Sequence, residues 1–204
     1  MSFNPKLPGE EEDAYQKAEI YFERGSRYLS LKKYKDAIEN YLKALEYVPN
    51  DYETRFNLAV AYFHSGKFTE SLEILKKLLE ENPEDPDLYF NIGSIYLETN
   101  KFKEAVEYFE KTIDKDNLYL DAFVNLGNAL FYLKEYKGAI ENYTKAIELD
   151  PANPDNYINR AMAYYHLKDK ATALADLEKA ISLDPTNKKA KLWIDKIENE
   201  FNDP

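Results

Sequence analysis

Apolar and polar residues alternate along most of the chain with the spacing of short amphipathic helices. Apolar side chains such as Ala37, Tyr41 and Ala44 recur three and four residues apart, which places them on one face of a helix. Polar segments with glycine, asparagine or proline interrupt this spacing, for example residues 64–67 and 81–86. Such residues favour turns. The pattern therefore predicts an all-α chain of short helices joined by tight turns.

The same pattern repeats with one fixed period. The positions of Pro49, Pro83, Pro151 and Pro185 differ by 34, 68 and 34. Five units follow this period without insertion, over residues 18–51, 52–85, 86–119, 120–153 and 154–187. The eighth position of each unit is glycine or alanine, and the twentieth is alanine or serine. Because small residues at fixed sites let two helices approach closely, each unit is predicted to be a pair of helices.

These positions resemble the tetratricopeptide repeat, a 34-residue helix–turn–helix unit with small residues at positions 8, 20 and 27 and proline at 32. The resemblance implies an all-α, right-handed α-solenoid, a superhelix of five such units. Residues 188–204 look like one more first helix without its partner, so they are expected to form a C-terminal capping helix and tail. Residues 1–13 contain Pro5, Pro8 and four consecutive acids and are predicted to be a disordered arm. Residues 14–17 are expected to extend the first helix.

One face of the first helix in each unit is left free to bind a ligand. At about 100° per residue, positions 2, 6, 9 and 13 lie opposite the packed face, and in the family these positions line the concave surface. Across the five units they include seven acids and no lysine or arginine, which predicts a polar, negative groove. The candidate peptide-binding residues are Asn57, Asn91, Asn125, Asn159, Asn128, Glu53, Asp87, Asp121, Asp155, His64, Tyr132 and His166.

The asparagines at position 6 form a ladder that suits an extended peptide. A carboxamide offers one acceptor and two donors, which match the C=O and N–H of a peptide backbone. Within the family, O-GlcNAc transferase carries an asparagine ladder at the corresponding place. The neighbouring carboxylates favour a ligand with lysine, arginine or a free amino terminus. An alternative stays open, because asparagine at 6 and an acid at 2 are common in the family and an acid near a helix start suits the helix dipole.

The family's carboxylate clamp, which grips acidic C-terminal tails, is not expected here. Its pattern is matched only by Asn128, Asn159 and Lys189. Val124 and Trp193 stand where two cations are required. A single cation in a negative groove would bind a dicarboxylate poorly.

Composition narrows the function further. The 204 residues include no cysteine, and the net charge of −11 argues against nucleic acid, whose phosphates bind basic surfaces. The longest apolar run, residues 58–63, is far short of the ~20 residues of a membrane helix, and the N-terminal segment does not resemble a secretory signal. We therefore expect a cytoplasmic protein without direct membrane insertion. His64 and His166 lie three repeats apart, so neither a metal site nor a catalytic site is expected, and no cofactor is implied.

The sequence thus predicts a non-enzymatic adaptor that captures an extended, basic or neutral peptide segment of a partner protein. The alternative is a self-assembling scaffold that forms homo-oligomers, in which the arm or the cap of one molecule enters the groove of another.

Overall fold

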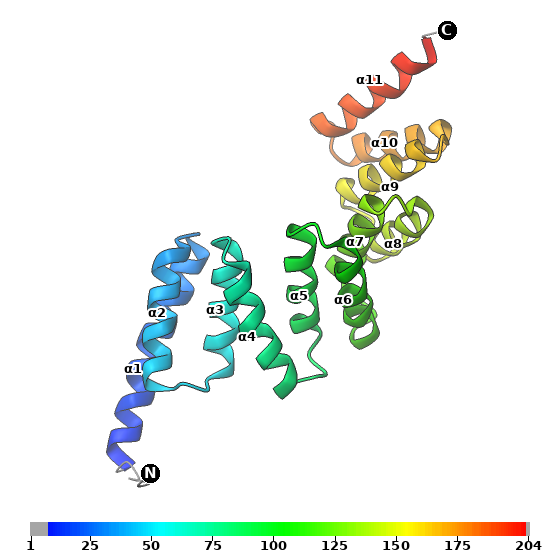
Figure 1. Cartoon of the computed structure of the whole chain (residues 1–204). Coiled ribbons are helices and arrows are strands. Elements are labelled where there is room, and N and C mark those ends of the chain that lie inside the picture. The colour runs from blue at the N-terminus through cyan, green and yellow to red at the C-terminus, as the bar shows by residue number, and fades with distance from the viewer. Residues whose placement is uncertain (1–7, 203–204) are drawn as a thin grey trace. The chain divides into compact units, whose positions relative to one another are not determined.

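The computed structural model describes residues 8–202, which form eleven α-helices and contain no strand. The helices are α1 (Pro8–Ser30), α2 (Tyr34–Tyr47), α3 (Tyr52–His64), α4 (Phe68–Glu81), α5 (Pro86–Glu98), α6 (Phe102–Lys115), α7 (Leu120–Tyr132), α8 (Tyr136–Leu149), α9 (Pro154–His166), α10 (Lys170–Leu183) and α11 (Lys188–Asn202) (Figure 1). The chain divides into an N-terminal unit, Met1–Ile95, and a C-terminal unit, Tyr96–Pro204. The all-α solenoid class predicted from the sequence is confirmed.

The helices follow the period of the sequence. In repeats 2 to 5 helix A, the first of the pair, occupies positions 1–13, and in all five repeats helix B occupies positions 17–30. Within the N-terminal unit α1 packs on α2, α2 on α3, and α3 on α4. Within the C-terminal unit α6 through α11 pack consecutively in the same way. Each of these two larger units is therefore a stack of helix pairs in which helices that follow each other in the sequence pack against each other.

A residue in the left-handed region ends helix A of every repeat. The φ angle at position 15 is positive in all five repeats, at Lys32, Gly66, Asn100, Lys134 and Lys168. The N–H of the following residue donates to the carbonyl five residues earlier, as from Glu135 to Leu130 over 2.9 Å. This is the Schellman arrangement that glycine normally supports. Only repeat 2 has glycine there, so four turns carry a side chain that disfavours their backbone conformation.

Replacing Lys134 by glycine is therefore expected to stabilise the protein by about 0.5–1 kcal/mol. A left-handed conformation costs a non-glycine residue roughly 1–2 kcal/mol, and the extra entropy of glycine in the unfolded chain removes part of that gain. Urea unfolding measures the change. The matched control is Glu141→Gly at an exposed site inside α8, which is expected to lose about 1 kcal/mol. A loss of similar size at Lys134 would contradict the strain argument.

The core of a repeat forms where position 8 of helix A meets position 24 of helix B. Tyr41 and Tyr143 occupy position 24 in repeats 1 and 4 and are buried. A Cβ atom on Gly25 or Gly127 would lie 2.6 Å from a ring carbon of the facing tyrosine. Repeats 2 and 5 instead combine alanine at position 8 with leucine at position 24. The two positions therefore change together, and the glycines are required by a close approach to the ring.

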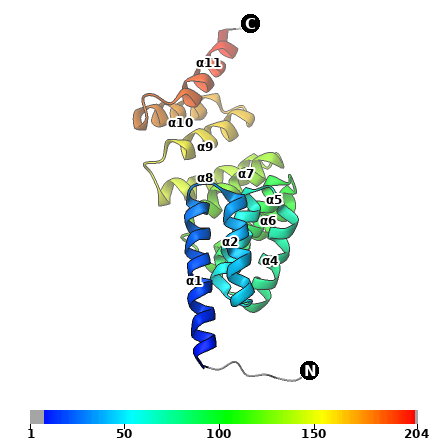
Figure 2. The ribbon, with the colours of Figure 1, turned by 90° about the vertical axis from the view of Figure 1, so that its left-hand side faces the viewer.

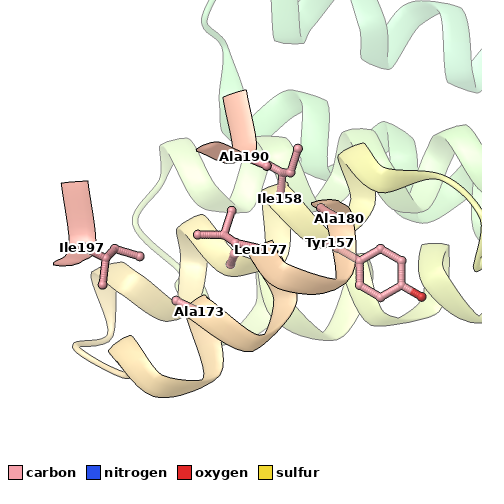
Figure 3. Close-up of a cluster of buried hydrophobic side chains, with 8 residues drawn as sticks. Tyr157, Ile158, Ala173, Leu177, Ala180, Ala190 and Ile197 are labelled. Atoms are coloured by element: carbon pink, nitrogen blue, oxygen red, sulfur yellow. The ribbon is translucent and has the colours of Figure 1, made fainter. Parts of the chain in front are cut away.

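Helix α11 closes the C-terminal unit. Its Ala190 and Ile197 are fully buried in one cluster with Ile158 and Leu177 (Figure 3). In a complete repeat, positions 4, 8 and 11 of helix A face the packed side. In α11 these positions are exposed and polar: Lys191, Asp195 and Glu198. At these three positions α11 therefore lacks the apolar stripe on which a further helix would pack.

Helix α1 begins earlier than its sequence predicts. Residues 8–13 belong to the helix, so a disordered arm is the wrong description for them, and residues 1–7 lie outside the described residues. Pro8 stands at the first helical position and acids follow it, an arrangement that starts a helix well. The first turns of α1 run past the end of α2 (Figure 2).

Within residues 8–202 no helix combines the length and apolar character needed to cross a membrane. In the same range no three histidine or acidic side chains are grouped so that they could hold a metal ion.

Candidate functional site

A groove of about 710 Å³ lies in the C-terminal unit, along helices A of repeats 4 and 5. It combines polar and apolar walls, and its polar part is mainly carboxamide. Six of the predicted site residues line it: Asp121, Asn125, Asn128, Tyr132, Asp155 and Asn159. The helical wheel therefore placed these six side chains on a common surface, and that surface is hollowed.

Tyr143 fixes two of the asparagines. Its hydroxyl donates to Oδ1 of Asn128 over 2.9 Å, and Nδ2 of Asn128 donates to Oδ1 of Asn125 over 3.4 Å. Burial raises the pKa of Tyr143 well above its ordinary value, so the hydroxyl keeps its proton and remains a donor at neutral pH. With Oδ1 of Asn125 engaged, its Nδ2 is left as a donor for a ligand carbonyl.

The cap helix supplies a cation to the same groove. Lys189 of α11 donates from Nζ to Oδ1 of Asn159 over 3.3 Å. Three carboxylates also line the groove, those of Glu98, Asp121 and Asp155. The groove therefore keeps an acidic balance, although Lys189 lowers it locally.

Asn156 is a buried polar residue in the lining of the groove. It is 1% exposed, and its Nδ2 has no hydrogen-bond partner within the described residues. An unpaired buried amide costs about 1–3 kcal/mol. The position is leucine, alanine, isoleucine or threonine in the other repeats, so packing alone does not require asparagine here.

The other predicted residues are distributed differently. Asn91 donates to the backbone carbonyl of Asp87 over 2.7 Å, so part of its hydrogen-bonding capacity is used within α5. Glu53 lines a smaller cavity of about 310 Å³ against α1. Asn57 is half-buried on α3. The four asparagines at position 6 are thus not equivalent, because each has a different local partner or none in the described residues.

The three residues with rings at position 13 share one environment. His64 stacks on Tyr34, Tyr132 on Phe102, and His166 on Tyr136, with ring centroids 5.2, 4.8 and 4.8 Å apart. The partner is always the aromatic residue at position 17 of the preceding repeat. These rings therefore join consecutive repeats, and of the three only Tyr132 lines the groove.

Models of the tetratricopeptide repeat match residues 28–92, 64–122 and 154–187, and a further TPR repeat model matches residues 127–168. The matches together cover well over half of the chain. The chain belongs to the tetratricopeptide repeat (TPR) family. A search of curated protein sequences gave no match.

Several solved TPR structures resemble this one. A crystal structure of MamA protein is 27% identical, with a TM-score of 0.72 over 86% of this chain and 95% of that chain. MamA 41-end from Desulfovibrio magneticus RS-1 is 20% identical, with a TM-score of 0.76 over 84% and 97%. YrrB, a TPR protein with an unusual peptide-binding site, is 22% identical, with a TM-score of 0.70 over 86% and 90%. The last two likenesses show the fold alone.

Sequence reasoning missed several groove residues of this TPR protein. Asn156 stands at position 3, which the helical wheel assigns to neither the packed nor the free face. Tyr143 belongs to helix B, and only its hydroxyl reaches the groove. Lys189 is recognisable as a partial clamp match, but nothing in the period places it beside Asn159. A wheel of one helix does not show how far a side chain from a neighbouring helix extends.

His166 makes stability depend on pH. Burial lowers its pKa below the ordinary 6.5, and Lys196 and Lys168 lower it further. The unfolded chain therefore binds the proton more readily, so the stabilisation from neutral His166 is present above pH ~6.5 and is lost as pH falls. The urea midpoint of His166→Phe, which retains a stacking ring, is expected to fall less between pH 7 and pH 5 than that of the wild type. Tyr132→Phe serves as the control, and its urea midpoint should depend on pH as that of the wild type does. An equal fall of the midpoint in all three proteins would contradict the assignment of the pH dependence to His166.

Proposed function

We propose that this TPR protein is a non-catalytic, cytoplasmic adaptor that binds an extended, basic or neutral peptide segment in the groove of its C-terminal unit. The observation that carries the proposal is the groove itself, which gathers six asparagines and three carboxylates around about 710 Å³. Its neutral polar groups suit a peptide backbone, and its charge suits a peptide without acids.

The carboxamides would bind the main chain of the peptide. Nδ2 of Asn125 is left to donate because the oxygen of that side chain is already engaged, and backbone carbonyls recur along an extended strand. Asn159 retains its own Nδ2 while Lys189 occupies its oxygen. Such contacts do not depend on the peptide's side chains, so they support affinity for many sequences.

The walls of the groove would select among side chains. Phe102 and Tyr132 stack on each other and, with Met162, form apolar surface in the lining. Asp121 and Asp155 stand at the starts of α7 and α9, where they attract lysine, arginine or a free amino terminus. Adding salt should weaken this part of the binding.

Asn125→Ala and Asn159→Ala are each expected to weaken peptide binding by about 1 kcal/mol, a typical net value for one hydrogen bond. The probe is a peptide selected on the wild-type protein from a random decapeptide library, and calorimetry gives its affinity. Asn40→Ala is the control, because among the described residues the amide of Asn40 bonds to its own helix alone, at the Asp36 carbonyl. Unchanged affinity in the Asn125/Asn159 double variant would rule out the ladder as the binding element.

A second candidate function is self-assembly, in which α1 of one molecule enters the groove of another. Tyr15 and Ile20 on α1 are 63% and 48% exposed, so α1 offers apolar surface to a neighbouring molecule. Light scattering against concentration, with and without residues 1–17, separates this from the adaptor function. A monomer at every concentration would exclude it.

A further inference from the structure

A second groove lies between the helices B of repeats 3 and 4. It has a volume of about 700 Å³ and shares no residue with the groove described above. Helix α6 forms one wall, α8 the other, and α7 the floor. Its lining residues are Glu107, Glu110, Lys111, Ile113, Asp114, Phe123, Leu126 and Asn142.

The floor of this groove is apolar and its walls are acidic. Phe123 and Leu126 on α7 provide aromatic and aliphatic surface. The carboxylates of Glu107, Glu110 and Asp114 are exposed and make no hydrogen bond or ion pair with the residues that the structure describes. Lys111 is the single cation in the lining, so three carboxylates against one ammonium leave the groove acidic.

The other polar residues of the lining are Asn142 and Lys111. Asn142 donates from Nδ2 to the backbone carbonyl of Gly138 over 2.9 Å, which leaves its Oδ1 for an incoming donor. The ammonium group of Lys111 lies 5.0 Å from the ring centroid of Tyr108. The groove thus offers a carboxamide oxygen and carboxylates above an apolar floor, a combination that suits a cation with an aliphatic stem.

Between repeats 4 and 5, the place equivalent to this groove is occupied by a side chain of the protein itself. Arg160 stands at position 7 of repeat 5, where repeat 4 has Leu126. Its Nε and Nη2 donate to the two oxygens of Asp176 over 2.8 and 2.7 Å, and its Nη1 donates to Thr144 over 3.0 Å. Asp176 and Thr144 are the counterparts, one repeat later, of Asn142 and Glu110. Between repeats 4 and 5 the protein therefore fills this site with its own guanidinium.

We propose that the groove between repeats 3 and 4 binds an arginine side chain presented by a partner protein, with an apolar residue beside it in the sequence. Glu110 and Asn142 receive the guanidinium as Thr144 and Asp176 receive that of Arg160. Glu107 and Asp114 add attraction at the rim, and Phe123 and Leu126 pack against the stem. Arginine is preferred to lysine because its planar fork can bond two acceptors at once. The proposal is independent of the peptide groove.

The test is an ¹⁵N NMR titration of the full chain with the blocked tripeptide acetyl-Leu-Arg-Leu-amide. We expect saturable shifts at the backbone amides of residues 107–114, 123, 126 and 142. The lysine tripeptide is expected to bind at least threefold more weakly, and Glu110→Gln/Asp114→Asn to weaken the arginine tripeptide at least fivefold. Glu141→Gln, which removes an exposed acid of α8 outside the lining, is the matched control and should change nothing.

A reciprocal exchange tests the comparison between repeats. Leu126→Arg/Asn142→Asp should fill the groove and abolish the shifts, and Arg160→Leu/Asp176→Asn should create a second binding site between repeats 4 and 5.

Shifts that do not saturate, that map elsewhere, or that are equal for lysine and arginine would overturn the proposal. So would the same shifts on raising protein concentration without peptide, because they would show an interface between copies. If an exchanged variant does not fold, the Glu110/Asp114 variant decides the question. Asn125→Ala/Asn159→Ala should leave this binding unchanged, which separates the outcome from that of the peptide groove.

Discussion

Gly127→Ala is expected to lower the free energy of unfolding by about 2 kcal/mol, within the range of about 1–3 kcal/mol that overpacking a core typically costs. The new Cβ atom would lie 2.6 Å from a ring carbon of Tyr143, which is too close for the ring to remain in place. The ring has little freedom to move, because it is 2% exposed and its hydroxyl is bonded to Asn128. Urea unfolding followed by circular dichroism measures the loss.

Two further variants make this expectation specific to the ring. Gly138→Ala in α8 places its Cβ 3.3 Å from a flexible methyl group of Leu130, so it should be neutral or gain up to about 1 kcal/mol from helix propensity. Gly127→Ala/Tyr143→Leu reproduces the alanine and leucine of repeats 2 and 5, and it should recover most of the loss. If the double variant is as unstable as the sum of its single variants, the two residues are not coupled and the explanation fails.

The fold could be predicted because each repeat supplies the same information again. The alanine or glycine residues at position 8 recur at one fixed interval through all five repeats, and chance does not maintain such a phase. Residues 188–197 likewise resembled one more first helix, and the structure has a helix there; its role as a cap stays a prediction. The start of α1 was not predicted, because proline and acids suit both a disordered arm and the first turn of a helix. The acids of residues 10–13 therefore did not distinguish the two.

The candidate site could be predicted only in part. Periodicity alone assigns Asn125, Asn128 and Asn159 to one face, and the structure shows those side chains around one groove. Periodicity does not reveal the hydroxyl of Tyr143, which comes from another helix. Nor does it reveal the position of His166, whose ring packs between repeats. The asparagines differ in their hydrogen-bond partners because those partners lie far away in the sequence. Asn128 bonds to Tyr143, 15 residues later, and Asn159 bonds to Lys189, 30 residues later. Such contacts differ between repeats that share the same consensus.

Arg160 and Asp176 illustrate this limit most clearly, because a charged pair stands where repeat 4 has Leu126 and Asn142. Both side chains are largely buried, at 18% and 10% exposure, and their guanidinium and carboxylate groups form two parallel hydrogen bonds. These two hydrogen bonds connect α9 to α10, and the bond from Arg160 to Thr144 connects α9 to α8. The pair joins the two helices of repeat 5, and the bond to Thr144 links that repeat to repeat 4, so its loss should loosen the end of a linear stack.

Asp176→Ala is therefore expected to cost about 3 kcal/mol, since it leaves a mostly buried guanidinium without its counter-ion. Arg160→Leu/Asp176→Asn removes both charges and installs the residues of repeat 4, so it should lie within about 1 kcal/mol of the wild type. Urea unfolding provides the free energies, and hydrogen exchange should locate the loss in Asp176→Ala to α9, α10 and α11. Glu178→Ala, at an exposed site of the same helix, is the control and is expected to change little. A single variant as stable as the double would mean that the guanidinium finds water or another acceptor, and that the pair positions the helices without stabilising them.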